Sequence, residues 1–177
     1  MWKPAGLAYR GWILAGSGRA SEAVQLITSA LAALRATGTT LFTPVSLSLT
    51  AKCCADLGQL DDAGRSVDEA TTVIETTKET WFEADVYRIA GEVALKSPQP
   101  DVARAEACFE RALSVARMQQ AKSWELRASM SLAHLWRDQG KVQQARELLA
   151  PVYAWFTGGF DTRDLKEAKA LLNELAA

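Results

Sequence analysis

The sequence has very little of the side-chain material from which catalytic and metal sites are built. It contains a single histidine, His134, and three cysteines, Cys53, Cys54 and Cys108, among 177 residues. A Ser-His-Asp or Cys-His catalytic site and a histidine-based metal site therefore lack material. The odd cysteine number and the missing Cys-x-x-Cys spacing argue against a disulfide framework, so we interpret the cysteines as small core residues. We expect no catalytic, cofactor-binding or metal-binding residues.

Long apolar runs and an excess of one charge are also missing. No run approaches the roughly eighteen apolar residues that span a bilayer, and the start Met-Trp-Lys-Pro lacks a signal peptide's apolar stretch. Twenty basic residues balance 21 acidic residues, which gives no electrostatic footprint for nucleic acid or an anionic membrane. We therefore expect a cytoplasmic chain whose partner is neither nucleic acid nor a membrane.

The segment 124–156 has the pattern of two helices joined by a tight turn. Apolar and small residues recur at three- and four-residue steps on both sides of Gly140, as on one face of a helix. Gly140 itself suits a helix C-terminal cap, because glycine adopts the left-handed backbone at little cost. A hairpin with an apolar seam on both arms cannot bury that seam alone. The rest of the chain must cover it.

The hairpin recurs along the chain with a period of about 40 residues. A small residue marks each second helix, with a breaker five positions before it and a larger apolar residue four positions after it. The small residues are Ala23, Ala63, Ala105 and Ala145, the breakers Gly18, Gly58, Pro100 and Gly140, and the larger residues Ile27, Val67, Phe109 and Leu149. The small residues expected in the first helices are Gly11, Ala51, Ala90 and Ala133, with a turn three residues longer in the third repeat.

We predict an all-α solenoid that forms one domain over residues 1–177. Four hairpins are expected at about residues 2–38, 42–78, 81–121 and 124–156, followed by an amphipathic closing helix at about 162–176. The helix starts are assigned to cap side chains: Asp101, Ser123, Asp161 or Thr162, and a capping box of Thr80 with Glu83.

Aromatic residues recur with the repeat. Trp2, Phe42, Trp81 and Trp124 stand at corresponding first-helix positions. A residue that recurs with the repeat is explained by the packing of the repeat. We therefore interpret these rings as core packing and not as a ligand cage.

The order of small and large residues resembles the tetratricopeptide repeat. The sequence departs from that family in its period, which exceeds the usual thirty-four residues, and in lacking the proline that ends the standard repeat. HEAT and armadillo repeats share a period of about 40 and stay open as an alternative, although they account less well for the alanine positions.

A closer resemblance is densest near the end of the chain. Three runs carry it: Ala-Lys-Ser-Trp-Glu-Leu-Arg-Ala from Ala121, Leu-Trp-Arg from Leu135, and Tyr-Ala-Trp-Phe-Thr-Gly-Gly-Phe-Asp-Thr from Tyr153. They resemble the C-terminal tetratricopeptide region of large bacterial signalling ATPases, whose chains begin with an adenylate-cyclase-like or winged-helix domain. No cyclase or ATPase motif lies in this sequence, so the resemblance implies only the scaffold role, in a stand-alone chain or a fragment of a longer ATPase.

The expected function is a non-catalytic protein-interaction scaffold, with a protein or peptide as its partner and no cofactor. Two alternatives stay open. One is a sensing domain that holds a small metabolite in the concave groove, and the other is a self-associating structural remnant.

Two surfaces are expected to make contacts. In stacked hairpins the first helices line the concave side, and we predict that an acidic or amphipathic peptide binds there to Tyr87, Arg88, Arg127, Met130 and His134. The first hairpin has no expected cover. A homodimer is therefore predicted through the exposed residues Leu7, Trp12 and Ile13.

Overall fold

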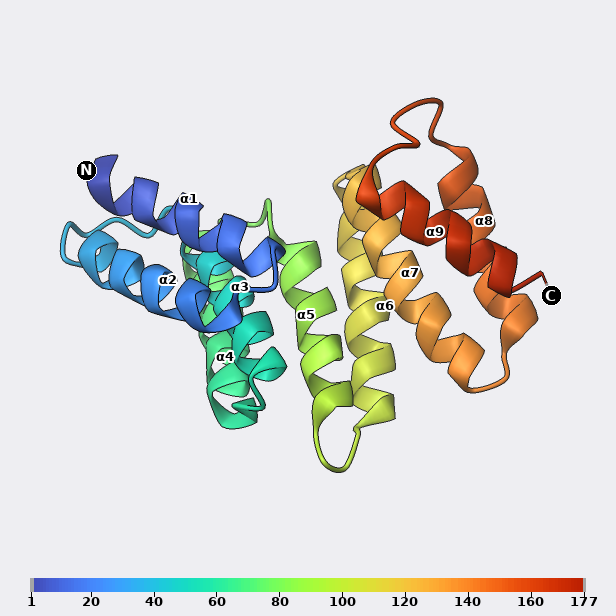
Figure 1. The fold of residues 1–177 in the computed structure, drawn as a ribbon, viewed down its shortest axis with the longest axis horizontal. Helices are drawn as coiled ribbons and strands as arrows, with labels where there is room; N and C mark the ends of the chain where they lie inside the picture. The colour runs from blue at the N-terminus through green and yellow to red at the C-terminus, as the bar shows by residue number, and fades with distance from the viewer. Residues whose placement is uncertain (1, 177) are drawn as a thin grey trace.

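The computed structural model describes residues 2–176, with side chains from residue 3 onward (Figure 1). In this part of the chain nine helices follow one another and no strand is present. They are α1 (Trp2–Gly16), α2 (Ala20–Arg35), α3 (Thr43–Asp56), α4 (Leu60–Thr77), α5 (Glu83–Lys96), α6 (Val102–Met118), α7 (Lys122–Asp138), α8 (Val142–Ala154) and α9 (Arg163–Glu174). The predicted all-α fold is confirmed.

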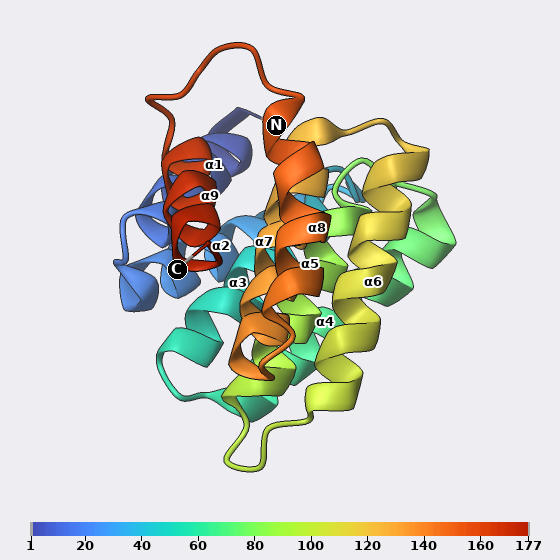
Figure 2. The ribbon, with the colours of Figure 1, turned by 90° about the vertical axis from the view of Figure 1, so that its right-hand side faces the viewer.

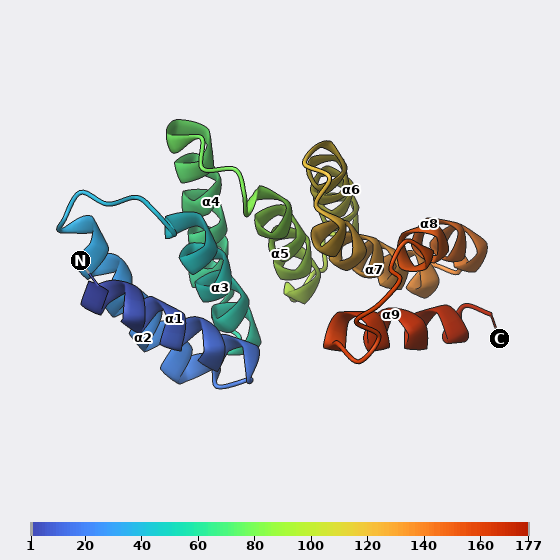
Figure 3. The same cartoon turned by 90° about the horizontal axis from the view of Figure 1, so that it is seen from above.

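The helices pair into four hairpins, α1–α2, α3–α4, α5–α6 and α7–α8, which stack side by side. The first helices α3, α5 and α7 each pack against both helices of the preceding hairpin, and α9 packs against α7 and α8. Figures 2 and 3 show α1 and α9 on the same side of this row. The predicted solenoid of four hairpins and a closing helix is confirmed.

Three of the predicted turns depend on glycine. Gly18, Gly58 and Gly140 have φ angles of 80°, 77° and 77°, in the left-handed region that a side chain disfavours. The remaining hairpin turn, between α5 and α6, is longer. There the carboxylate of Asp101 accepts a hydrogen bond from the backbone N–H of Arg104 at 2.9 Å, so this predicted cap is confirmed.

Two other predicted caps are wrong. Thr80 does not cap α5, because the helix begins at Glu83 and Phe82 occupies the N-cap position. The carbonyl of Thr80 is used instead, and it accepts from the backbone N–H of Glu83 at 3.0 Å. Ser123 lies inside the first turn of α7, since the short connection from α6 brings the helix start to Lys122. Backbone turns satisfy these helix starts where the sequence pattern indicated side chains.

The start of α9 matches the prediction in position but not in bonding. Thr162 occupies the N-cap position, yet its side chain caps no backbone N–H of the helix. Its hydroxyl donates instead to the carbonyl of Gly159 at 2.7 Å. The threonine thus closes the turn before α9.

Each hairpin closes on a small residue of its first helix that faces a larger residue of its second helix. A Cβ atom built on Gly11 would lie 2.5 Å from Ile27 Cγ1, and one on Gly91 would lie 2.5 Å from Phe109 Cε1. Both distances are shorter than van der Waals contact allows, so only glycine fits at these two crossings. The equivalent residues Ala51 and Ala133 lie in the same core clusters as Val67 and Leu149.

The packing residue of the third hairpin is therefore Gly91, and the prediction of Ala90 is wrong. Gly91 follows Ala51 by forty residues and precedes Ala133 by forty-two, so the α5–α6 turn is longer by two residues and not by three. Ala90 is buried too, on a neighbouring face of α5, and it shares a core cluster with Val67 of α4. One residue along a helix is a rotation of about 100°, so the correction changes which side chains of α5 share a face.

A row of aromatic rings runs from Trp12 of α1 across the starts of α3, α5 and α7. Trp12 meets Phe42 at a centroid distance of 5.7 Å, Phe42 meets Trp81 at 6.2 Å, and Phe82 meets Trp124 at 4.9 Å, all edge to face. Such pairs contribute about 0.5–1.5 kcal/mol each beyond burial. The packing interpretation is confirmed for Phe42 and Trp124, which pack against core clusters.

The buried ring of the third hairpin is Phe82 and not Trp81. Phe82 lies in the core, whereas Trp81 is exposed and its indole N–H donates to Glu79 Oε1 at 2.9 Å. The expected packing of the Trp2 side chain lies outside the described residues. Adjacent aromatic residues left the sequence pattern ambiguous at this position.

The substitution Gly91→Ala tests the close crossing. It should lower the free energy of unfolding by about 1–3 kcal/mol, because the buried Phe109 ring cannot move away from the new methyl group. Gly64→Ala is the matched control, since Gly64 also lies inside a helix but a methyl group there would have nothing within 4 Å. It should raise stability by about 0.5–1 kcal/mol. Urea denaturation measures both, and shifts of the same sign would contradict the crossing.

Candidate interaction surfaces

Arg88, one of the predicted groove residues, is held by carboxylates of its own helix. Its Nε donates to Asp85 Oδ1 at 2.6 Å, and its Nη1 donates to Glu92. Burial opposes the positive charge, but Asp85 and Glu92 outweigh burial and raise the pKa of Arg88. The guanidinium is thus permanently charged, and this charge is already paired inside the protein.

Arg127 is held by the closing helix. Its Nε donates to Asp164 Oδ2 in the first turn of α9 at 2.7 Å, and its guanidinium lies 5.0 Å from the ring centroid of Trp124. Asp164 also contributes to the raised pKa of Arg88, so this carboxylate acts on both arginines. The structure therefore brings Arg88 and Arg127 together around α9.

Met130 is not accessible, contrary to the prediction. Only 8% of its surface is exposed, and it shares a core cluster with Leu165 and Leu171 of α9. Figure 2 shows α9 beside α7, on the face where the groove residues of α7 were expected. The closing helix covers this face instead of extending the solenoid beyond its end.

Tyr87 faces a different side of α5 from Arg88. The guanidinium of Arg111 on α6 lies 5.5 Å from its ring centroid, and the ring packs beside the buried residues Ala84 and Leu113. The groove residues of α5 were predicted by their offset from Ala90, but the small residue at the helix crossing is Gly91. The α5 residues equivalent to Arg127, Met130 and His134 are therefore Asp85, Arg88 and Glu92.

His134 is the one predicted groove residue that is exposed. Partial loss of water around its ring lowers the pKa of His134, and the positive charge of Arg137 lowers it further. Glu174 and Glu167 on α9 and Asp138 on α7 act in the opposite direction. The neutral imidazole is favoured at the edge where α7 meets α9.

The residues predicted for self-association point in different directions. Ile13 is 71% exposed, while Trp12 turns toward the next hairpin and its indole N–H donates to Ser46 Oγ at 3.3 Å. Leu7 is half-buried. The expectation that all three side chains lie on one exposed face is wrong for Trp12, because the face of α1 that carries it packs on α3.

The exposure of Ile13 is unusual for its position in the repeat. Forty residues later, Cys53 is 1% exposed and shares a core cluster with Ala23 and Ile27 of the preceding second helix. Val93 of α5 is half-buried, and Leu135 of α7 is buried in a cluster with Phe109 of α6. In α3 and α7 the side chain at this position packs against the preceding hairpin, whereas in α1 it is exposed.

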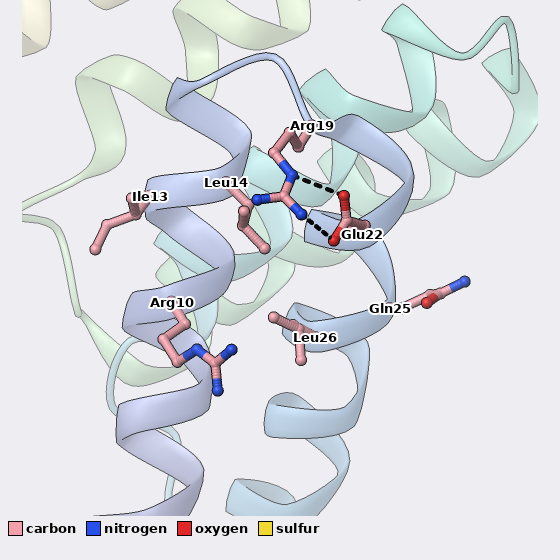
Figure 4. A pocket seen from close by; sticks show the side chains of 7 residues that line it. All are labelled: Arg10, Ile13, Leu14, Arg19, Glu22, Gln25 and Leu26. Carbon is pink, nitrogen blue, oxygen red and sulfur yellow. Dashed lines mark hydrogen bonds and ion pairs between the residues drawn. The ribbon is translucent and has the colours of Figure 1, made fainter.

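An open pocket of about 370 Å³ lies beside Ile13 between α1 and α2. Figure 4 shows Arg10, Leu14 and Leu26 pointing toward the space between the helices, with Ile13 projecting outward. Arg19 and Glu22 form its rim through an ion pair of 2.5 Å. The sequence analysis missed these residues, although aligning Arg10 and Leu14 with Thr50 and Cys54 indicates positions that are buried in the next hairpin.

Residues 2–176 contain no cluster suited to a metal ion. No three His, Cys, Asp or Glu side chains of this region are grouped closely enough to hold one. Within the same region, no helix has the length and apolar character needed to cross a bilayer.

The lowered pKa of His134 can be tested by NMR, because the chain has one histidine. We expect a pKa below the ordinary value of about 6.5. Arg137→Gln should raise it, whereas Arg146→Gln on α8 should leave it unchanged. Since the folded-state pKa is the lower one, stability present above the unfolded-state value is lost as the pH falls through the folded-state value. A His134 pKa above 6.5 in the parent would contradict the geometry.

Comparisons with known proteins support the fold and not a particular family. No protein-family model matches the sequence, and no curated protein is similar to it. A crystal structure from Podosopora anserina, of a putative kinesin light chain with nearly identical TPR-like repeats, is similar over 99% of this chain and 87% of its own. The TM-score is 0.69 and the identity 18%. A single-residue variant of that protein gives the same score and identity over 97% and 84%. The chain therefore has a TPR-like solenoid fold.

Proposed function

We propose that this chain is a non-catalytic protein-interaction module that binds a helix of another chain on the outer face of α1 and α2. The observation that carries the proposal is Ile13, which is 71% exposed at a position where the later hairpins cover their side chain. TPR-like repeats generally mediate protein interactions, which supports a scaffold role.

The packing inside the chain indicates what kind of element fits this face. Cys53 and Leu135 lie in core clusters with the preceding second helices α2 and α6. A helix placed on α1 in the same way would cover Ile13 and the pocket between α1 and α2. Its polar edge would lie near Arg10 and the Arg19–Glu22 pair, which supports an amphipathic helix with charges of both signs.

A second copy of the chain is the occupant we propose. A two-fold dimer brings the same patch of both subunits together, so Ile13 would pack against Ile13 of the other copy. Arg10 and Glu22 on one copy would then face opposite charges on the other. The exposed Ile13, at a position that is buried in α3 and α7, supports this dimer and does not require Trp12.

The face formed by the first helices is proposed as a second binding surface, for a peptide. His134 and the paired Arg88 and Arg127 are the proposed contacts for an acidic or amphipathic peptide, which would compete for the arginines with Asp164 or Glu92. Met130 is removed from this set because α9 buries it.

We also propose that the module works in the cytoplasm as the regulatory repeat region of a bacterial signalling ATPase. The support is the sequence resemblance at residues 121–128, 135–137 and 153–162. In the last run, Trp155 lies against Phe156 at 5.2 Å and Tyr153 lies beside Phe160 at 6.0 Å. Sequencing the full transcript tests this setting, which requires an in-frame ATPase domain upstream, joined so that the outer face of α1 and α2 stays free for the second copy.

Ile13→Glu tests the dimer. The parent should scatter light as a dimer at high micromolar concentration, and Ile13→Glu should scatter as a monomer, because a carboxylate would be buried without a partner. Met118→Glu is the matched control, since Met118 is 73% exposed at the end of α6, and it should leave the mass unchanged.

A parent that stays monomeric at high micromolar concentration would contradict the second copy as occupant. Equal masses for the parent and Ile13→Glu, with unchanged circular dichroism, would contradict the face itself.

A further inference from the structure

A second open pocket, of about 270 Å³, lies where the end of α6, the start of α7 and the end of α8 meet. Arg117, Lys122 and Glu125 form its polar side, and Pro151 and Trp155 belong to its apolar side. It is far along the chain from the α1–α2 face, on other helices. A binding function here neither requires nor excludes the dimer proposed above.

Position 151, which lines the pocket, carries a proline where the two preceding hairpins carry long charged side chains. The equivalent residues are Glu69 in α4 and Arg111 in α6. Glu69 pairs with Arg35 of the preceding second helix, and Arg111 pairs with Glu83 at 3.4 Å. Pro151 has no charged group that could pair with Arg117 as Glu69 pairs with Arg35, and both Pro151 and Arg117 line the pocket.

Arg117 and Pro151 correspond in the repeat to the ion pair of Arg35 and Glu69 near the other end of the solenoid. Arg117 and Pro151 each stand two repeats, or eighty-two residues, after Arg35 and Glu69. The arginine is therefore the same in both places, but the carboxylate of Glu69 has no equivalent at Pro151. The chain itself shows which kind of group fits against this arginine.

The apolar wall of the pocket is also unusually open. Trp155 is 58% exposed, whereas its equivalent in the third hairpin, Val115, is 1% exposed. The ammonium of Lys122 lies 5.7 Å from the Trp155 ring centroid. An occupant could thus place apolar atoms on Trp155 while a polar group reaches the cations.

Glu125 holds the two cations in place from below. Its carboxylate is buried, and it accepts from Arg117 Nε at 3.1 Å and from Lys122 Nζ at 2.6 Å. Burial opposes ionisation, but these hydrogen bonds lower the pKa of Glu125, so it stays charged at neutral pH. Arg117 is half exposed, and its two Nη nitrogens remain to donate outward.

Glu147 is the remaining charged group of the pocket. It is exposed at the rim, where its Oε1 accepts from Gln143 Nε2 at 2.7 Å. The lining of the pocket thus carries two cations and two carboxylates. Glu125 is buried and paired with Arg117 and Lys122, whereas Glu147 is exposed at the rim.

We propose that this pocket binds an acidic side chain of a protein partner, with the carboxylate on Arg117 and an adjacent apolar residue on Trp155. The carboxylate takes the place that Glu69 occupies against Arg35. The guanidinium fork is well suited to a carboxylate, because it can donate two parallel hydrogen bonds.

The test uses a pair of short probes and the full chain. Acetyl-Leu-Glu-Leu-amide and its neutral match acetyl-Leu-Gln-Leu-amide are titrated while the indole N–H of Trp155 is followed by NMR. The glutamate probe should bind in the millimolar range and at least about fivefold more tightly than the glutamine probe, since charge-assisted hydrogen bonds are about twice as strong as neutral ones. Its affinity should fall as sodium chloride is raised.

Two substitutions at one position separate occupancy of the pocket from folding. Pro151→Glu should fill the pocket from within the chain, as Glu69 does, and abolish binding of the glutamate probe. Pro151→Ala leaves the pocket open and should bind the probe like the parent. Both should raise the thermal midpoint, because a proline inside a helix removes a backbone hydrogen bond.

Three results would overturn the proposal. The first is equal affinity of the two probes, and the second is unchanged affinity in Pro151→Glu. The third is no shift of the Trp155 indole signal at 10-fold excess over the expected millimolar range, about 10 mM. Loss of binding in Pro151→Glu with retention in Pro151→Ala would support it.

Discussion

The close crossing of the two helices in each hairpin is the constraint on which the rest of the structure depends. At Gly11 and Gly91 the second helix approaches so closely that a single methyl group would collide with Ile27 or Phe109. A small residue, glycine or alanine, recurs at this position in every hairpin, and each later first helix packs on both helices of the hairpin before it. A position buried by this stacking is open only where the stack ends. The binding face proposed on α1 and α2 is based on this difference between Ile13 and its equivalents.

The repeat could be predicted from the sequence because its period and its small residues are regular. The third hairpin shows where this stops. Ala90 and Gly91 are both small, as Trp81 and Phe82 are both aromatic, and in each case the choice depends on which side chain meets the neighbouring helix. A shift of one residue along a helix rotates the side chain by about 100° around the helix axis. For this reason Tyr87 lies against α6, on a different face of α5 from Arg88.

The candidate surfaces were harder to predict because they depend on elements outside the repeat. Nothing in the amphipathic pattern of α9 states that it lies on α7, so the burial of Met130 could not be foreseen. Ile13 was identified from the missing cover alone, which needs no side-chain geometry. Pro151 could have been noticed in the sequence, because aligned repeats place the charged residues Glu69 and Arg111 at the same position.

Hydrogen exchange of backbone amides at several protein concentrations tests the central claim, that the outer face of α1 and α2 is an uncovered stacking surface. In dilute protein the account predicts faster exchange in α1 and α2 than in α5 to α7, because only the inner hairpins are covered on both sides. Raising the concentration should slow exchange in α1 and α2 and leave α5 to α7 unchanged, since a second copy protects only the face that it covers. Uniform protection along the solenoid, independent of concentration, would contradict the account.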